Sequence, residues 1–238
     1  MSTSLRTRLA GAAIILTIAA ASTLALAADA GKKGSNAGAT AKGSTEAAAA
    51  VETLALADQL ALYGIRQNDP VAIIQAAKMK KGLPPRVLEA KKASEGKGTK
   101  GADKTSGNDL SADALLARAD GMAAGNPTLA GLIKDARATK SRGATRGPTA
   151  HRDTVLAGNT DVYNVSFRGG EQAAVLVSGD GDTDLDLYVM DENGNAICSD
   201  TDTSDTMLCT WTPAWTGPFQ IRIRNLGRVY NRYDMAIN

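Results

Sequence analysis

The sequence is poor in the residue types that most often carry recognisable chemistry. Aromatic residues make up only 4% of its 238 residues, and there is a single histidine, His151. This scarcity argues against one large core filling the whole chain. With two cysteines, a zinc site of four cysteines, or of two cysteines and two histidines, cannot be built. A formal net charge of +2 also argues against binding to a polyanion, so we predict no nucleic-acid partner.

The N-terminal residues have the pattern of an export signal. Two arginines precede a largely apolar run over residues 9–27, which ends in the small-x-small cleavage motif Ala25-Leu26-Ala27. We predict a signal peptide over residues 1–28 and no membrane span after its cleavage. The alternative is an uncleaved anchor, because the run approaches the length of a short span. The protein is therefore expected to be periplasmic or secreted.

Composition divides the rest of the chain into two regions. Residues 51–140 are Ala-rich, with apolar residues at helical spacing, whereas residues 153–238 hold most of the aromatic residues and show period-two alternation. The predicted fold class is α + β and multidomain, with N-terminal helical hairpins joined by flexible linkers to a C-terminal all-β sandwich. Segments rich in Gly, Ala, Ser, Thr and Lys are predicted as a disordered linker at 29–50 and as linkers at 93–108 and 141–152.

Two segments of the helical region share a start signal. Asn68-Asp69-Pro70 and Asn126-Pro127 each place a capping side chain before a proline at the first helical position. Ser111 is a further candidate N-cap. Two copies of a helical hairpin and two unrelated hairpins both fit this layout. The helical region has an excess of basic residues and the β region an excess of acidic ones, so the two regions either attract each other or are solvated independently.

Alternate aspartates mark the start of one predicted strand. Asp180, Asp182, Asp184 and Asp186 are followed by Asp191, and oxygen ligands of this kind suit calcium. Leu185 stands where an EF-hand loop needs glycine, which excludes an EF-hand. A calcium site of another type is therefore predicted as a candidate. The alternative is that Asp184 and Asp186 face solvent from a strand, while the other aspartates form turns.

The two cysteines and the aromatic residues supply two more candidate features. Cys198 and Cys209 flank a polar turn and are predicted to form a structural disulfide across a hairpin, as an exported protein allows. Trp215, which lies in a predicted loop, and Tyr188 are candidate ligand-binding residues, although aromatic residues in a small sandwich more often belong to the core.

Catalysis has little support in the sequence. His151 lies in a polar, Arg-flanked segment, and two carboxylates on one strand face share one environment, so nothing separates their pKa values for acid and base roles. We therefore predict that the protein is not an enzyme.

Residues 153–238 resemble the bacterial pre-peptidase C-terminal domain. Four stretches carry the resemblance: Asp161–Val165, Gly179–Val189, Asp191–Asn195 and Gly217–Asn225. The resemblance implies a jelly-roll-like β-sandwich of the kind appended to exported peptidases. Related modules include calcium-dependent collagen-binding domains, and Asp184 and Asp186 match the family's acidic strand positions. The catalytic domain that usually precedes this module is replaced here by the helical region.

These observations predict an exported, non-enzymatic binding module. Its sandwich would recognise a protein or polysaccharide of the cell envelope or exterior, with calcium as an assisting ion and no other cofactor. The alternative is an envelope scaffold that binds its partner through the helical region and uses the sandwich as a tether. A hydrolase that uses the aspartates is the third and weakest hypothesis.

Overall fold

The structure is a computed structural model that describes residues 34–38, 43–101, 107–140 and 147–238. The predicted signal peptide lies outside the described residues, as does part of each predicted linker. Everything from Lys33 onward belongs to one compact unit. The helices and the sandwich are therefore parts of one unit, whereas the sequence predicts two domains joined by linkers.

The first two helices begin and end at capping residues, and α1 already begins at Glu46, inside the segment predicted as a disordered linker at 29–50. The helix α1 (Glu46–Gln67) begins after Thr45, whose hydroxyl accepts from the Ala48 amide, and ends at Asn68 in the left-handed conformation. Asp69 then caps α2 (Pro70–Gly82), with proline in the first turn. Each helix end is thus satisfied by an adjacent polar side chain or turn.

The second helical pair follows the same layout. Ser111 caps α3 (Ala112–Met122), and Asn126 caps α4 (Pro127–Arg137). The four helices bury a core of their own, which includes Ile73, Leu116 and Ile133. Within the described residues, α1 is the one helix long and apolar enough to span a membrane, yet half of its apolar window is buried inside the protein.

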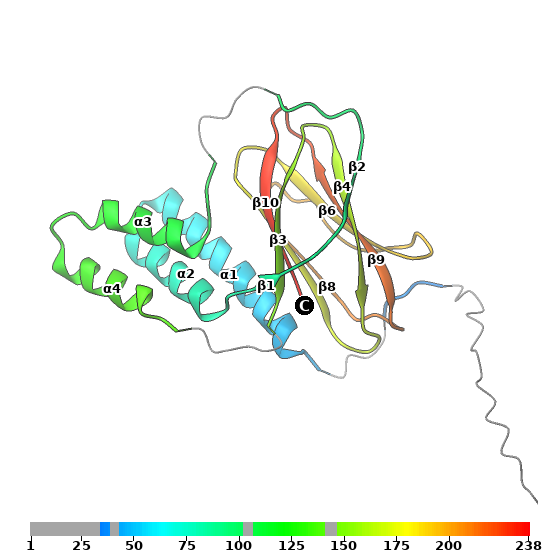
Figure 1. The fold of residues 1–238 in the computed structure, drawn as a ribbon, viewed down its shortest axis with the longest axis horizontal. Coiled ribbons are helices and arrows are strands. Elements are labelled where there is room, and N and C mark those ends of the chain that lie inside the picture. The colour runs from blue at the N-terminus through cyan, green and yellow to red at the C-terminus, as the bar shows by residue number, and fades with distance from the viewer. Residues whose placement is uncertain (1–33, 39–42, 102–106, 141–146) are drawn as a thin grey trace, which may run out of the picture. The chain divides into compact units, whose positions relative to one another are not determined.

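Ten strands form two five-stranded sheets, which we call sheet A and sheet B (Figure 1). Sheet A has the order β1-β3-β10-β5-β8, and sheet B has the order β2-β4-β9-β6-β7. All neighbouring pairs are antiparallel except β1 and β3. The strands are β1 (Arg86–Val87), β2 (Lys92–Glu95), β3 (Thr149–Val155), β4 (Thr160–Phe167), β5 (Ala173–Gly179), β6 (Leu185–Asp191), β7 (Ala196–Asp200), β8 (Thr206–Trp211), β9 (Gly217–Asn225) and β10 (Asn231–Ile237).

The main core lies between the two sheets. Alternate residues of each strand point inward, as in Leu185, Leu187 and Val189 of β6. Phe167, Trp211 and Phe219 are among the rings packed together in this core, with centroids 4.9 to 5.8 Å apart. The predicted all-β sandwich of residues 153–238 is confirmed, although its first strand already begins at Thr149.

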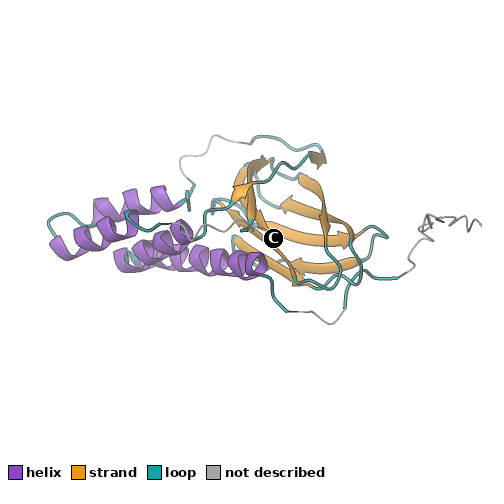
Figure 2. Ribbon diagram, turned by 60° about the horizontal axis from the view of Figure 1, so that its bottom comes forward, coloured by secondary structure: helices purple, strands orange, loops and turns teal. Residues whose placement is uncertain are grey.

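Sheet A is buried on its outer face as well. Val51 and Leu54 of α1 pack on Ala174 and Leu176 of β5 and on Ala236 of β10, and Figure 2 shows α1 against this sheet. Every residue of β5 is buried. The sandwich therefore has a third layer, which the sequence predicts as a separate domain.

The segment after α2 differs from its prediction. The sequence predicts no strand in the helical region 51–140 and a linker at 93–108, but β1 extends sheet A beside β3, and β2 extends sheet B beside β4. Both strands are exposed along their whole length and carry no alternating pattern. They form because β3 and β4 offer unpaired edges to a passing extended chain.

The disulfide is confirmed, but its position differs from the prediction. Cys198 and Cys209 are bonded, with their Cα atoms 5.8 Å apart. The strands that carry them are not a paired hairpin, because β7 pairs with β6 in sheet B and β8 pairs with β5 in sheet A. The bond therefore joins the edge strands of the two sheets.

Candidate functional site

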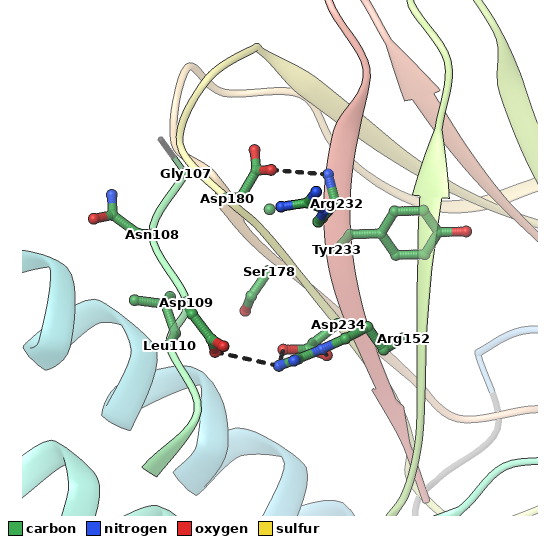
Figure 3. A pocket seen from close by; sticks show the side chains of 11 residues that line it. Gly107, Asn108, Asp109, Leu110, Arg152, Ser178, Asp180, Arg232, Tyr233 and Asp234 are labelled. Atoms are coloured by element: carbon green, nitrogen blue, oxygen red, sulfur yellow. Dashed lines mark hydrogen bonds and ion pairs between the residues drawn. The ribbon is translucent and has the colours of Figure 1, made fainter. Parts of the chain in front are cut away.

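A polar pocket lies where the segment before α3 crosses the end of sheet A (Figure 3). It encloses about 190 Å³, and its wall combines residues 107–110 with the ends of β5 and β10. The chain passes very close to β5, because a Cβ on Gly107 would lie 2.8 Å from the Asp180 Cβ. The Asn108 amide donates to the Asp180 carbonyl at 2.7 Å, which holds this wall in place.

Arg152 of β3 donates hydrogen bonds to two carboxylates of the pocket. Its Nε donates to Asp234 Oδ1 at 2.7 Å, and a terminal nitrogen donates to Asp234 Oδ2 at 2.8 Å and to Asp109 at 3.4 Å. The bond to Asp234 raises the pKa of Arg152 further above its usual value. Partial burial raises the pKa of Asp109, but hydrogen bonds from Ser111 and the charge of Arg152 outweigh it and hold that pKa below its usual value. Arg152 is thus a fixed cation between two carboxylates.

A larger, mostly apolar cavity continues on the other side of Arg152 and Asp234. It encloses about 480 Å³ between the helices and the outer face of sheet A. Arg152 and Asp234 line both cavities, so the two are neighbours, and we call the pair the groove, with a polar end and an apolar end. The residues that make the apolar end are Leu54, Pro84, Pro85, Ala150, Leu176 and Ala236.

A buried ion pair forms part of the same wall. Asp58 of α1 pairs with Lys80 of α2 and accepts a hydrogen bond from Ser178 Oγ of β5 at 2.7 Å. Burial raises the pKa of Asp58 above its usual value, against the opposing effects of Lys80 and Ser178. This trio ties both helices to sheet A beside the cavity.

The candidate calcium residues are not gathered by the fold. Asp180 lines the polar pocket, where its Oδ2 accepts from the Arg232 amide at 3.0 Å, while Asp182 and Asp184 are exposed. Asp186 is buried and accepts from the Tyr188 hydroxyl at 3.0 Å. In the part of the chain that the structure describes, no three His, Cys, Asp or Glu side chains are placed to hold a metal ion. Calcium binding stays a prediction.

Asp191 has a structural role at the far end of β6. Its Oδ1 accepts from the amides of Asn193 and Asn195, at 2.9 and 2.8 Å, and its Oδ2 accepts from the Asn36 amide at 2.8 Å. These bonds outweigh the effect of burial and lower the pKa of Asp191. The carboxylate therefore shapes the turn that follows it.

The two candidate aromatic residues occupy different places. Tyr188 lies on the outer face of sheet B, opposite Arg222 of β9. Trp215 lies in the loop before β9, where its indole Nε1 donates to Glu192 Oε1 at 2.6 Å and its amide donates to Asn36 Oδ1 at 2.9 Å. The loop position predicted for Trp215 is confirmed, and its contact with Asn36 has no signal in the sequence.

The residues of the groove were not predicted as a site. Asp58, an acidic residue within the apolar pattern of α1, is the one signal that points to it, because a buried carboxylate requires a partner. Arg152 and Asp234 are directly opposite each other in the β3–β10 register. Since that register joins distant segments, the sequence pattern does not predict the pair.

Comparisons with known proteins concern the sandwich. No protein-family model and no curated protein sequence matches the chain. Among solved structures, 38% of this chain is similar to 88% of the pre-peptidase C-terminal domain of a collagenase from Bacillus anthracis, with 13% identity and a TM-score of 0.34. The same share is similar to 84% of PliG, a periplasmic lysozyme inhibitor from Aeromonas hydrophila, with 12% identity and a TM-score of 0.31. The first is the kind of domain that residues 153–238 resemble, and the likeness is one of fold alone.

Proposed function

We propose that this protein is an exported, non-enzymatic binding module whose ligand site is the groove between the helices and sheet A. The ligand class is a protein segment or polymer of the cell exterior that presents an apolar group beside a polar one. The observation that carries the proposal is the joining of an apolar cavity of about 480 Å³ to a polar pocket through Arg152 and Asp234.

The groove has the properties of a preformed ligand site. Its larger cavity falls in the size range of small-ligand pockets, about 300–1,000 Å³. Its apolar end would bury an apolar group, and the fixed charges at its polar end would orient the ligand. Several separate parts of the chain form it, and the Asp58–Lys80 ion pair holds two of them, α1 and α2, together.

The arrangement of the reactive residue types supports a non-enzymatic role. Both cysteines are bonded to each other, so neither is a nucleophile. His151 Nε2 contacts Asp153 Oδ2 at 3.3 Å, and its ring meets Tyr163 edge-on. Ser94, a serine joined to the same network, donates to Asp161 at 2.6 Å. Its hydroxyl is thus bound to a carboxylate instead of the histidine that would activate it.

The disulfide supports the exported location. Bonds of this kind persist in oxidising compartments and are rare in the cytosol. The predicted signal peptide and the disulfide are independent features, and both favour the periplasm or the exterior.

The proposal is tested with a probe that combines apolar rings with an anionic group. Anilinonaphthalene sulfonate should bind the mature chain, with its rings in the cavity and its sulfonate toward Arg152. The variant Ala150→Phe fills the apolar end and should lower the dye fluorescence at least fivefold. The matched control Ala196→Phe adds the same ring at an exposed position of β7 and should leave this binding unchanged. Equal dye binding by both variants, with equal melting temperatures, would contradict the proposed site.

A further inference from the structure

A short N-terminal segment, Gly34–Gly38, lies against the far end of sheet B; we call it the strap (blue in Figure 1). It contacts the turn after β6, formed by Asp191–Asn195, and the loop that contains Trp215. The strap comes more than 150 residues before either loop in the sequence. It is therefore held there by tertiary contacts alone.

Asn36 is the anchor of the strap and is completely buried. Its backbone amide donates to Asp191 Oδ2 at 2.8 Å. Its side-chain oxygen accepts from the Trp215 amide at 2.9 Å, and its side-chain nitrogen donates to Glu192 Oε2 at 3.4 Å. Both ends of the side-chain amide thus meet a group of the complementary type.

The residues around Asn36 are also held by contacts that do not involve the strap. Asp191 is bonded to the amides of Asn193 and Asn195, which shapes the turn, and the Trp215 indole fixes Glu192. The side-chain amides of Asn193 and Asn195 both donate to the Gly34 carbonyl at 3.0 Å. The site therefore contacts the backbone of the strap as well as the Asn36 side chain.

Gly217 leaves the room that the Asn36 side chain occupies. A Cβ on Gly217 would lie 3.2 Å from both Asn36 Nδ2 and Glu192 Oε1. The pocket therefore fits an asparagine closely. An aspartate in its place would set a carboxylate against Glu192, and an alanine would leave the Trp215 amide and Glu192 without this partner.

We propose that the Asp191–Asn195 turn and the Trp215 loop form a peptide-binding site that recognises asparagine in a short segment of small residues. The strap is its built-in occupant and competes with an asparagine-bearing peptide of another protein. Because the strap is part of the same chain, its effective concentration at the site is high, on the order of millimolar for a short connection. A competing peptide gains access when the strap is weakened or removed.

The test uses the mature full-length chain and a synthetic peptide with the sequence of residues 33–38, Lys-Gly-Ser-Asn-Ala-Gly. The variant Asn36→Ala opens the site, and the indole N–H resonance of Trp215 reports its state. Adding the peptide to this variant should restore the wild-type resonance. A peptide with Asp in place of Asn should bind at least tenfold more weakly, and wild-type chain should bind the Asn peptide at least tenfold more weakly than the variant does.

A second variant keeps the proposal testable if Asn36→Ala fails to fold. Glu192→Gln replaces the carboxylate with an amide that can donate to a peptide Asp, so in this chain the tenfold preference for the Asn peptide should fall to threefold or less. The control Ser35→Ala changes an exposed strap residue and should leave the Trp215 resonance unchanged. The proposal is overturned if neither the Asn36→Ala chain nor the Glu192→Gln chain binds the Asn peptide, or if Asn and Asp peptides bind the Asn36→Ala chain equally.

Discussion

The two sheets of the sandwich are contacted from outside in different ways. Sheet A presents Ala174, Leu176 and Ala236, and α1 covers them with apolar side chains. Sheet B presents polar residues such as Tyr188 and Arg222 on its outer face, and the strap binds its far end through hydrogen bonds. Apolar burial is lost only when the layers separate, whereas polar contacts can be exchanged for water or another peptide. The difference indicates a permanent layer on sheet A and an exchangeable segment at sheet B.

The largest expected effect comes from breaking the apolar cover of sheet A. Leu176→Ala should lower the free energy of unfolding by about 3 kcal/mol, because it leaves a cavity between β5 and α1. Asn164→Ala, on the exposed side of sheet B, should change it by less than about 0.5 kcal/mol. Urea denaturation measures both. Equal, small effects would mean that α1 contributes little to the stability of the sandwich.

The disulfide should rank next, because it joins the edges of the two sheets. The double variant Cys198→Ser, Cys209→Ser should lose about 2–3 kcal/mol through the greater freedom of its unfolded chain. A reducing agent should produce the same loss in the wild-type protein and none in the variant. If reduction left the wild-type melting temperature unchanged, the link between sheets would not limit unfolding.

The polar contact between α1 and sheet A should matter less than the apolar one. Asp58→Asn keeps a partner for Ser178 but leaves Lys80 without its carboxylate, and we expect a loss of about 1–2 kcal/mol. Ser178→Ala removes the other partner of Asp58 and serves for comparison. A gain in stability on Asp58→Asn would show that burying the carboxylate costs more than the ion pair contributes.

Acid should distinguish the strap from the helical layer. Hydrogen bonds lower the pKa values of Asp191 and Glu192, so their stabilisation of the strap is complete above their ordinary pKa values and is lost as the pH falls through the lowered ones. The resonance of the Trp215 backbone amide, which donates to Asn36 Oδ1, should therefore shift below about pH 4, and the shift should be absent in Asn36→Ala. If the strap stayed bound until the whole protein unfolded, the strap on sheet B and the helical layer on sheet A would be equally permanent.

The smallest expected effect concerns calcium at the start of β6. If Asp184 and Asp186 bind the ion, calcium should stabilise the protein by about 0.4 kcal/mol when its free concentration equals Kd. The double variant Asp184→Asn, Asp186→Asn should lose that increment in calcium and lose nothing in a chelator. If calorimetry showed the same loss of stability in both buffers, the prediction that Asp184 and Asp186 bind calcium would be wrong.

Local patterns could be predicted because neighbouring residues carry them. Asp69, Ser111 and Asn126 cap their helices with side chains two or three residues from the amides that they bind. The alternation in β6 and β9 likewise predicts which side of each strand faces the core. Cys198 and Cys209 could be paired because they are the only two cysteines.

Single residues of the candidate site could be predicted from the sequence, but their contacts with one another could not. Trp215 was identified as a loop residue, and Asp180 and Asp191 as polar turn residues, but each contacts a distant segment that no local pattern indicates. Arg152 meets Asp234 across a register that joins segments 82 residues apart, and Asn36 meets Trp215 from 179 residues away. Residues so far apart in the sequence come into contact only when the packing of the layers brings them together.

The sequence by itself determined the starts of α2, α3 and α4, the β-sandwich and the disulfide pairing, since each depends on spacing or on a residue type present only twice. The tertiary structure alone decided that α1 covers sheet A, that β1 and β2 extend the two sheets, and that the disulfide crosses between them. It also decided that the strap buries Asn36. The physical reason is that local hydrogen bonds and side-chain alternation require only adjacent residues, whereas buried faces, sheet edges and isolated polar groups take whichever distant segment satisfies them.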